Sequence, residues 1–138
     1  MKVNTYLNFG GNCEEAFRYY EKHLGGKILM MTTFGESSGM AGQVAPEWAS
    51  KIMHGRIELG DTVLMGNDVP GDRHHPMRSV YISLSVESSP EAERIFEVLS
   101  KEGEVFMPMQ ETFFAHRFAM LRDQFGTLWM VIHERARH

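Results

Sequence analysis

With 138 residues, 43% of them hydrophobic, the chain is long enough for one domain with a substantial core and too short for two ordinary domains. A formal charge of −4 and the lack of any lysine or arginine run argue against nucleic acids and anionic membranes as partners. Because no stretch reaches the roughly 20 apolar residues of a membrane span, and the N-terminus lacks a signal-peptide core, we expect a cytoplasmic protein.

The first half of the chain predicts a strand, a helix and three further strands. Asn12 is the expected cap of the helix, Cys13 a small half-buried residue near its start, and Gly25 its end. Gly60 and Asp61 lie between two runs of strand formers, which is the pattern of a hairpin turn. The expected strands are residues 3–9, 27–34, 51–59 and 62–66, with a long loop at 35–50.

The second half predicts the same order of elements. Residues 78–86, RSVYISLSV, alternate apolar and polar side chains, as a strand does. Ser89 as cap and Pro90 at the first helical position predict a helix that closes near Gly103. The remaining expected strands are residues 104–109, 116–121 and 127–134, and a turn-rich loop at 67–77 precedes this half.

The sequence also repeats itself at the level of residues. The segment EAFRYYE, residues 15–21, shares its glutamates, alanine and arginine with EAERIFE, residues 91–97, and YLNF at Tyr6 is echoed by YISL at Tyr81. Such self-similarity at a fixed offset is the signature of a duplication. We therefore predict an α+β protein made of two βαβββ modules, at about residues 3–66 and 78–134, within a single domain of residues 1–138.

Several segments resemble one family. YLNFGGNCEEAFRYYEKHLGGKI, IMHGRIELGDTVLMGND, QETFFAHRF and DQFGTLWM are similar to recurring segments of the PhnB-like branch of the vicinal oxygen chelate superfamily, which includes glyoxalases, bleomycin resistance proteins and dioxygenases. Together they span nearly the whole chain, and the last two are the specific ones. The resemblance implies that the two modules form a curled, cup-like sheet with the helices outside.

The resemblance also implies four metal-ligand positions, on the first and last strand of each module. In this chain they fall on Tyr6, Met65, Tyr81 and Met130. A phenol must lose a proton with a pKa near 10 before it ligates well, and a thioether is soft and neutral, so this set is unsuited to a hard divalent cation. We therefore expect no metal at the usual centre and no cofactor.

A relocated metal site is the alternative, and its candidate ligands are His54, His116 and Glu134. These three are scattered along the chain without the tight spacing typical of metal motifs. They are better explained as a pocket histidine, a histidine at the start of a strand and a solvated strand end. His133 is expected to point away from Glu134, because neighbouring residues of a strand face opposite sides.

A small-molecule pocket explains the same residues without a metal. Phe113, Phe114 and Trp129 offer apolar and stacking area, although aromatic side chains dominate protein cores for the same reason. His54 and Arg56 share one strand face with Glu58. Arg56 is either a bidentate clamp for an anionic ligand or, as we expect, the partner of Glu58. The full predicted pocket consists of Tyr6, His54, Arg56, Met65, Tyr81, Phe113, Phe114, His116, Trp129 and Met130.

Three functions are considered for this sequence. The first is a metal-free protein that binds a small apolar or aromatic compound, and the second is a glyoxalase- or dioxygenase-like enzyme that uses the relocated ligands. The third, a ubiquinone-pathway methyltransferase as this branch is often labelled, is rejected because no glycine-rich strand-to-helix turn for an adenosyl cofactor is present. No catalytic residue can be assigned. Exposed sheet edges and the loops at 35–50 and 67–77 predict a homodimer.

Overall fold

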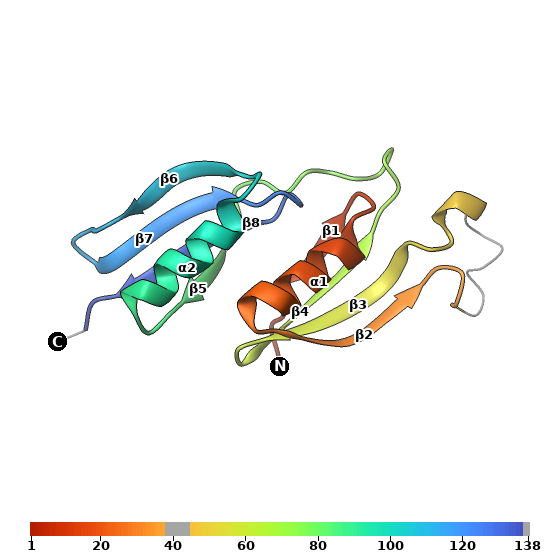
Figure 1. Ribbon diagram of the computed structural model, residues 1–138. Coiled ribbons are helices and arrows are strands. Elements are labelled where there is room, and N and C mark those ends of the chain that lie inside the picture. The colour runs from red at the N-terminus through yellow and green to blue at the C-terminus, as the bar shows by residue number, and fades with distance from the viewer. Residues whose placement is uncertain (38–44, 137–138) are drawn as a thin grey trace. The chain divides into compact units, whose positions relative to one another are not determined.

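The computed structural model describes residues 1–37 and 45–136, which divide into two compact units whose boundary along the chain falls between His75 and Pro76 (Figure 1). The predicted long loop at 35–50 falls partly on residues 38–44, which lie outside the described residues. The first unit contains β1 (Tyr6–Phe9), α1 (Cys13–Leu24), β2 (Lys27–Thr33), the short 3-10 helix η1 (Pro46–Trp48), β3 (Ile52–Leu59) and β4 (Thr62–Asp68). The second contains β5 (Ile82–Ser85), α2 (Ser89–Ser100), β6 (Glu104–Gln110), β7 (Ala115–Arg122) and β8 (Leu128–Glu134).

Both units have the same topology. The strand order is β1-β4-β3-β2 in the first sheet and β5-β8-β7-β6 in the second. In each sheet the first strand runs parallel to the last, and the other pairs are antiparallel. One helix packs on one face of each sheet (Figure 1). The predicted α+β class and the two βαβββ modules are therefore confirmed.

A buried aspartate holds the start of α1. Asn12 occupies the expected N-cap position, but its side chain makes no capping hydrogen bond. Instead, Asp68 Oδ1 accepts from the backbone N–H groups of Gly11 and Cys13, at 3.0 and 2.9 Å, and Asp68 Oδ2 accepts from Ile52 N at 2.8 Å. A carboxylate at a helix N-terminus is favoured by the helix dipole. The last residue of β4 thus fastens both α1 and the start of β3.

Two paired glycines let α1 approach its sheet closely. Gly55 of β3 is the register partner of Gly66 of β4, and the ring of Phe17 lies over both. A Cβ atom at Gly66 would lie 2.9 Å from Phe17 Cζ, which is too close for an ordinary contact. The helix ends at Gly25, which has the left-handed φ of 70° expected of a C-cap glycine.

The start of α2 differs by one residue from the prediction. Ser88, not Ser89, is the N-cap, because its hydroxyl accepts from Glu91 N at 3.2 Å while its backbone is extended. Ser89 is the first helical residue, and its hydroxyl lies 3.0 Å from His133 Nδ1. The helix ends at Ser100, before the predicted stop at Gly103.

The first strand of each sheet is shorter than the alternation of side chains predicts. Strand β5 begins at Ile82 rather than at residue 78 because Ser79 has a φ of 61°, which interrupts an extended chain. Strand β1 begins at Tyr6 rather than at Val3. Within the described residues, no helix has both the length and the apolar character needed to cross a membrane.

Candidate functional site

The positions that the superfamily uses for metal ligands lie on the sheet faces opposite the helices. Tyr6 and Met65 are register partners in β1 and β4. In the second unit Met130 of β8 pairs with Ser83, whereas Tyr81 lies one residue before β5. By its pairing partner, Ser83 is the register counterpart of Tyr6, so the repeat of YLNF in YISL is not accompanied by the same strand register.

These residues do not fit a divalent metal ion. Burial raises the pKa of the Tyr6 phenol, with a smaller contribution from Cys13, so the phenolate form is even less accessible than in water. Its oxygen lies 3.2 Å from His54 Nδ1, and the two rings stack at 5.8 Å. Thioether and hydroxyl groups complete the set. Among residues 1–37 and 45–136, no three His, Cys, Asp or Glu side chains form a cluster able to hold a metal ion.

Four of the predicted pocket residues meet on the open face of the first sheet. Met65 pairs with both Tyr6 and Arg56, and His54 reaches the Tyr6 hydroxyl. The expected ion pair between Arg56 and Glu58 is not formed, and Arg56 has no ion-pair partner in the described part of the chain. Both side chains stand on one strand face, two residues apart, where they run parallel rather than toward each other.

A second group of predicted residues surrounds a cavity of about 820 Å³ in the second unit. Phe113 is 93% exposed and Phe114 41% exposed. Their rings meet edge to face at 5.2 Å, and Phe114 meets Phe118 in the same way at 5.1 Å. The cavity is lined by Phe113, Phe114, His116, Ile132, Glu134, Arg135 and Ala136. We call it the aromatic cavity.

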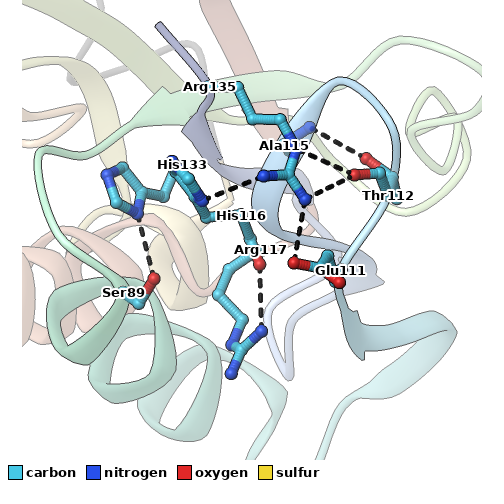
Figure 2. Close-up of polar contacts among 8 residues, drawn as sticks. All are labelled: Ser89, Glu111, Thr112, Ala115, His116, Arg117, His133 and Arg135. Atoms are coloured by element: carbon cyan, nitrogen blue, oxygen red, sulfur yellow. Dashed lines mark hydrogen bonds and ion pairs between the residues drawn. The ribbon is translucent and has the colours of Figure 1, made fainter.

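Arg135 holds the loop that presents these rings (Figure 2). Its guanidinium pairs with Glu111 at 2.8 Å and donates to the carbonyl of Thr112 at 3.2 Å. Its backbone N–H donates to the carbonyl of Phe114 at 3.2 Å. The connection from β6 to β7 is therefore tied to the chain that follows β8, and the exposed rings are carried by a braced loop.

The polar side chains that line the aromatic cavity already have hydrogen-bond or ion-pair partners within the protein. Arg135 Nη1 lies 3.4 Å from His116 Nδ1, and because an arginine only donates, Nδ1 is the acceptor in this contact and the ring N–H lies on Nε2. Glu134 accepts from the hydroxyl of Ser85 at 3.3 Å, and Arg135 is balanced by Glu111. The cavity thus combines aromatic walls with polar side chains that already make contacts within the protein.

The other predicted pocket residues lie elsewhere. Trp129 is fully buried, and its indole N–H donates to Asp123 Oδ2 at 2.8 Å, so it belongs to the core of the second unit. Met130 packs against the buried cluster that contains Phe118 and Ile132. Tyr81 lines a different cavity of the same unit.

The candidate ligands of a relocated metal site are divided between the units. His54 belongs to the first, while His116 and Glu134 line the aromatic cavity of the second. His133 bonds to Ser89 of α2, whereas Glu134 bonds to Ser85 of β5, as expected for neighbours on opposite strand faces.

Arg135 and Glu111 were not among the residues predicted for the site. Both lie just outside strands, where charged residues are ordinarily solvated, so their types carried no special signal. The nearest clue is that each flanks the aromatic stretch 112–134 at one end.

Comparisons with known proteins agree with this architecture. The family model of the Glyoxalase/Bleomycin resistance protein/Dioxygenase superfamily matches residues 2–131. Protein YjdN of Escherichia coli (strain K12) is 30% identical over 138 residues, covering 95% of this chain and 94% of its own. The crystal structure of protein PA1353 from Pseudomonas aeruginosa has a TM-score of 0.88 and 40% identity and covers 99% of both chains.

The fold is also shared with the PhnB protein of Bacillus cereus, which bears the name of a 3-demethylubiquinone-9 3-methyltransferase. The TM-score is 0.82 at 21% identity, with 96% of this chain and 99% of that chain covered. The chain belongs to the glyoxalase/bleomycin resistance protein/dioxygenase superfamily.

Proposed function

We propose that the protein binds a small apolar or aromatic compound in the aromatic cavity, without a divalent metal ion at the positions the superfamily uses. The observation that carries this proposal is the pair of exposed phenylalanine rings at the mouth of a cavity of about 820 Å³. Ligand sites combine apolar and aromatic walls with a few placed polar groups, and this cavity has both.

The exposed rings support the binding of an apolar partner. A phenyl ring left in water is unfavourable by roughly 25 cal/mol for each Å² of apolar surface, and Phe113 is almost fully exposed. A flexible loop would be expected to fold such a ring inward, but Arg135 and Thr112 fix the loop. Covering the ring with a ligand recovers this energy without reordering the loop.

The existing contacts of the charged side chains support a neutral ligand. An ionised ligand would have to compete with Glu111 for Arg135 or with Ser85 for Glu134. A neutral compound can instead use the Nε2–H of His116 as a donor without breaking either contact. The cavity therefore favours a neutral aromatic compound that accepts a single hydrogen bond.

The proposal is tested with the neutral fluorescent probe N-phenyl-1-naphthylamine. We expect saturable fluorescence enhancement with the intact chain and a tenfold or larger loss of affinity in Phe114→Ala, because one edge-to-face wall worth about 1–3 kcal/mol is removed. Leu29→Ala is the matched control, since Leu29 is a similarly exposed apolar side chain (45%) on β2 of the other unit.

Two results would contradict the proposal. Equal loss in Phe114→Ala and Leu29→Ala would show that the probe binds exposed apolar surface in general. Stoichiometric manganese, iron, nickel or zinc in protein purified without a tag would contradict binding without a metal and would favour the metal-dependent enzyme.

The proposal includes a homodimer. Strands β2 and β6 are sheet edges, and each carries exposed apolar residues, among them Leu29 and Val105. Open edges with apolar side chains are commonly covered by a second chain. Light scattering on the purified protein is expected to give twice the chain mass of 15.8 kDa, and a monomer at working concentration would refute this part.

A further inference from the structure

A second cavity in the second unit has a different chemistry. Its volume is about 630 Å³, and it lies at the ends of β6 and β7 where the chain enters β5. Its lining contains two arginines and no acidic residue: Arg78, Ser79, Tyr81, Phe106, Arg122 and Leu128. We call it the arginine cavity.

One arginine of this cavity is fixed in place. The Arg122 guanidinium lies over the ring of Phe106, 5.4 Å from its centroid. It is held there by Glu104, at 3.2 Å, and by the carbonyl of Met77, at 3.1 Å. A guanidinium has five N–H donors, so these two contacts leave donors that face the cavity. Stacking on an aromatic ring positions a planar cation for a planar anion.

The other arginine has no partner. Arg78 is exposed and makes no hydrogen bond or ion pair with the residues that the structure describes. The following residue, Ser79, has a φ of 61°, a conformation that non-glycine residues rarely adopt. The turn at Ser79 keeps residues 78–80 out of β5 and brings Arg78 to the lining that contains Arg122.

The apolar part of the lining is aromatic. Tyr81 meets Phe106 edge to face at 6.5 Å, and Phe106 remains 42% exposed. The Tyr81 hydroxyl has no hydrogen-bond partner among the described residues and is an additional donor. The cavity therefore offers a wall for a flat apolar body next to two cations and a phenol.

We infer that the arginine cavity binds an aromatic carboxylate, with Arg78 and Arg122 on the carboxylate and Phe106 and Tyr81 on the ring. The planar fork of a guanidinium matches the two oxygens of a carboxylate. Arg78, which has no ion-pair partner in the described part of the chain, leaves an excess of positive charge that selects an anion. This site lies outside the function proposed above and does not depend on it.

The test compares three probes by titration calorimetry: 2-naphthoate, its neutral amide 2-naphthamide, and inorganic phosphate. We expect 2-naphthoate to bind at least tenfold more tightly than 2-naphthamide, because the amide cannot pair with the arginines. Phosphate, which lacks the flat apolar body, is expected not to bind at millimolar concentration. Equal affinities for the acid and the amide, or phosphate binding as tight as that of 2-naphthoate, would overturn the inference.

The variant Arg78→Met is expected to weaken 2-naphthoate about 10- to 100-fold, which corresponds to the loss of one charge-assisted contact. Because Arg78 is exposed and unpartnered, this change should leave the melting temperature unaltered. Arg94→Met removes the same charge from α2, on the opposite face of the sheet, and is the control. Equal effects of the two variants would reduce the binding to net charge and refute the site.

Measuring each variant with the probe of the other cavity distinguishes binding at the two sites. If Arg78→Met weakens 2-naphthoate but leaves N-phenyl-1-naphthylamine binding intact, the arginine cavity is supported whatever happens at the aromatic cavity. If Phe114→Ala abolishes binding of both probes while Arg78→Met affects neither, the acid binds in the aromatic cavity and the inference fails.

Discussion

The two units share one order of elements, but each uses its buried aspartate differently. Asp68 joins backbone groups from three places, the β1–α1 connection, the first residue of α1 and the start of β3. Asp123 closes a local turn, where it accepts from Phe125 N and Thr127 N at 2.9 Å and from the indole of Trp129. The same side chain therefore serves long-range assembly in one unit and a hairpin in the other.

The open faces of the sheets have diverged as well. The first presents Tyr6, His54 and Arg56, a polar group centred on one hydrogen bond. The second presents Phe118, Met120 and Met130, and both cavities described above lie in its unit. The framework of the duplication is preserved while the side chains on the open faces are not. We therefore place both proposed ligand sites in the second unit.

The largest change in stability is expected when the two buried aspartates are replaced. Asp68→Asn should lower the free energy of unfolding by about 2–3 kcal/mol, because its amide N–H would face the Ile52 N–H, a backbone donor that cannot be removed. Asp123→Asn places an amide donor against the Trp129 indole instead. Urea denaturation of both variants measures the difference.

Of the two variants, only Asp123→Asn should regain stability through a second substitution. In Asp123→Asn combined with Trp129→Phe the opposing indole donor is gone, so the two substitutions should be coupled favourably by about 1–2 kcal/mol. Strict additivity of the two changes would show that the indole contact does not organise the turn.

A somewhat smaller effect is expected where α1 touches its sheet. Gly66→Ala should cost about 1–3 kcal/mol, because the added methyl meets Phe17 at 2.9 Å and the Leu7 carbonyl at 3.1 Å. Gly71→Ala is the matched control, since a Cβ there meets nothing within 4 Å. Thermal unfolding compares the two. A Gly66 variant as stable as the control would mean that the close helix contact is not tight in solution.

The smallest change in stability is expected from the first helical residue of α1, Cys13, whose counterpart in α2 is Ser89. Burial raises the pKa of the Cys13 thiol, and the nearby Asp68 and Glu14 raise it further. A raised folded-state pKa adds stability below the unfolded value of roughly 8.5, and this stability is lost as the pH rises above it.

We therefore expect the wild-type chain to lose about 1 kcal/mol relative to Cys13→Ala between pH 7.5 and pH 9.5. Denaturant unfolding at both pH values measures this loss. A constant difference between the two proteins across that range would indicate that the Cys13 thiol ionises as readily in the fold as in the unfolded chain.

The order of elements and the side-chain types at the superfamily's ligand positions could be predicted from the amino-acid sequence. Strand alternation, the glycines at 25 and 60 and the repeat of residues 15–21 are local signals, so they can be read without knowing any contact. That Tyr6, Met65 and Met130 are poor ligands for a divalent ion follows from their side chains alone.

Which residues contact one another could not be predicted without the three-dimensional structure. Asp68 caps a helix that begins 55 residues earlier, Ser83 rather than Tyr81 pairs with Met130, and Trp129 belongs to the core. The brace of Arg135 on the β6–β7 loop and the meeting of Arg78 with Arg122 likewise join distant parts of the chain. Pairing register and long-range hydrogen bonds depend on how the strands align in space, and residue type and periodicity do not specify that alignment.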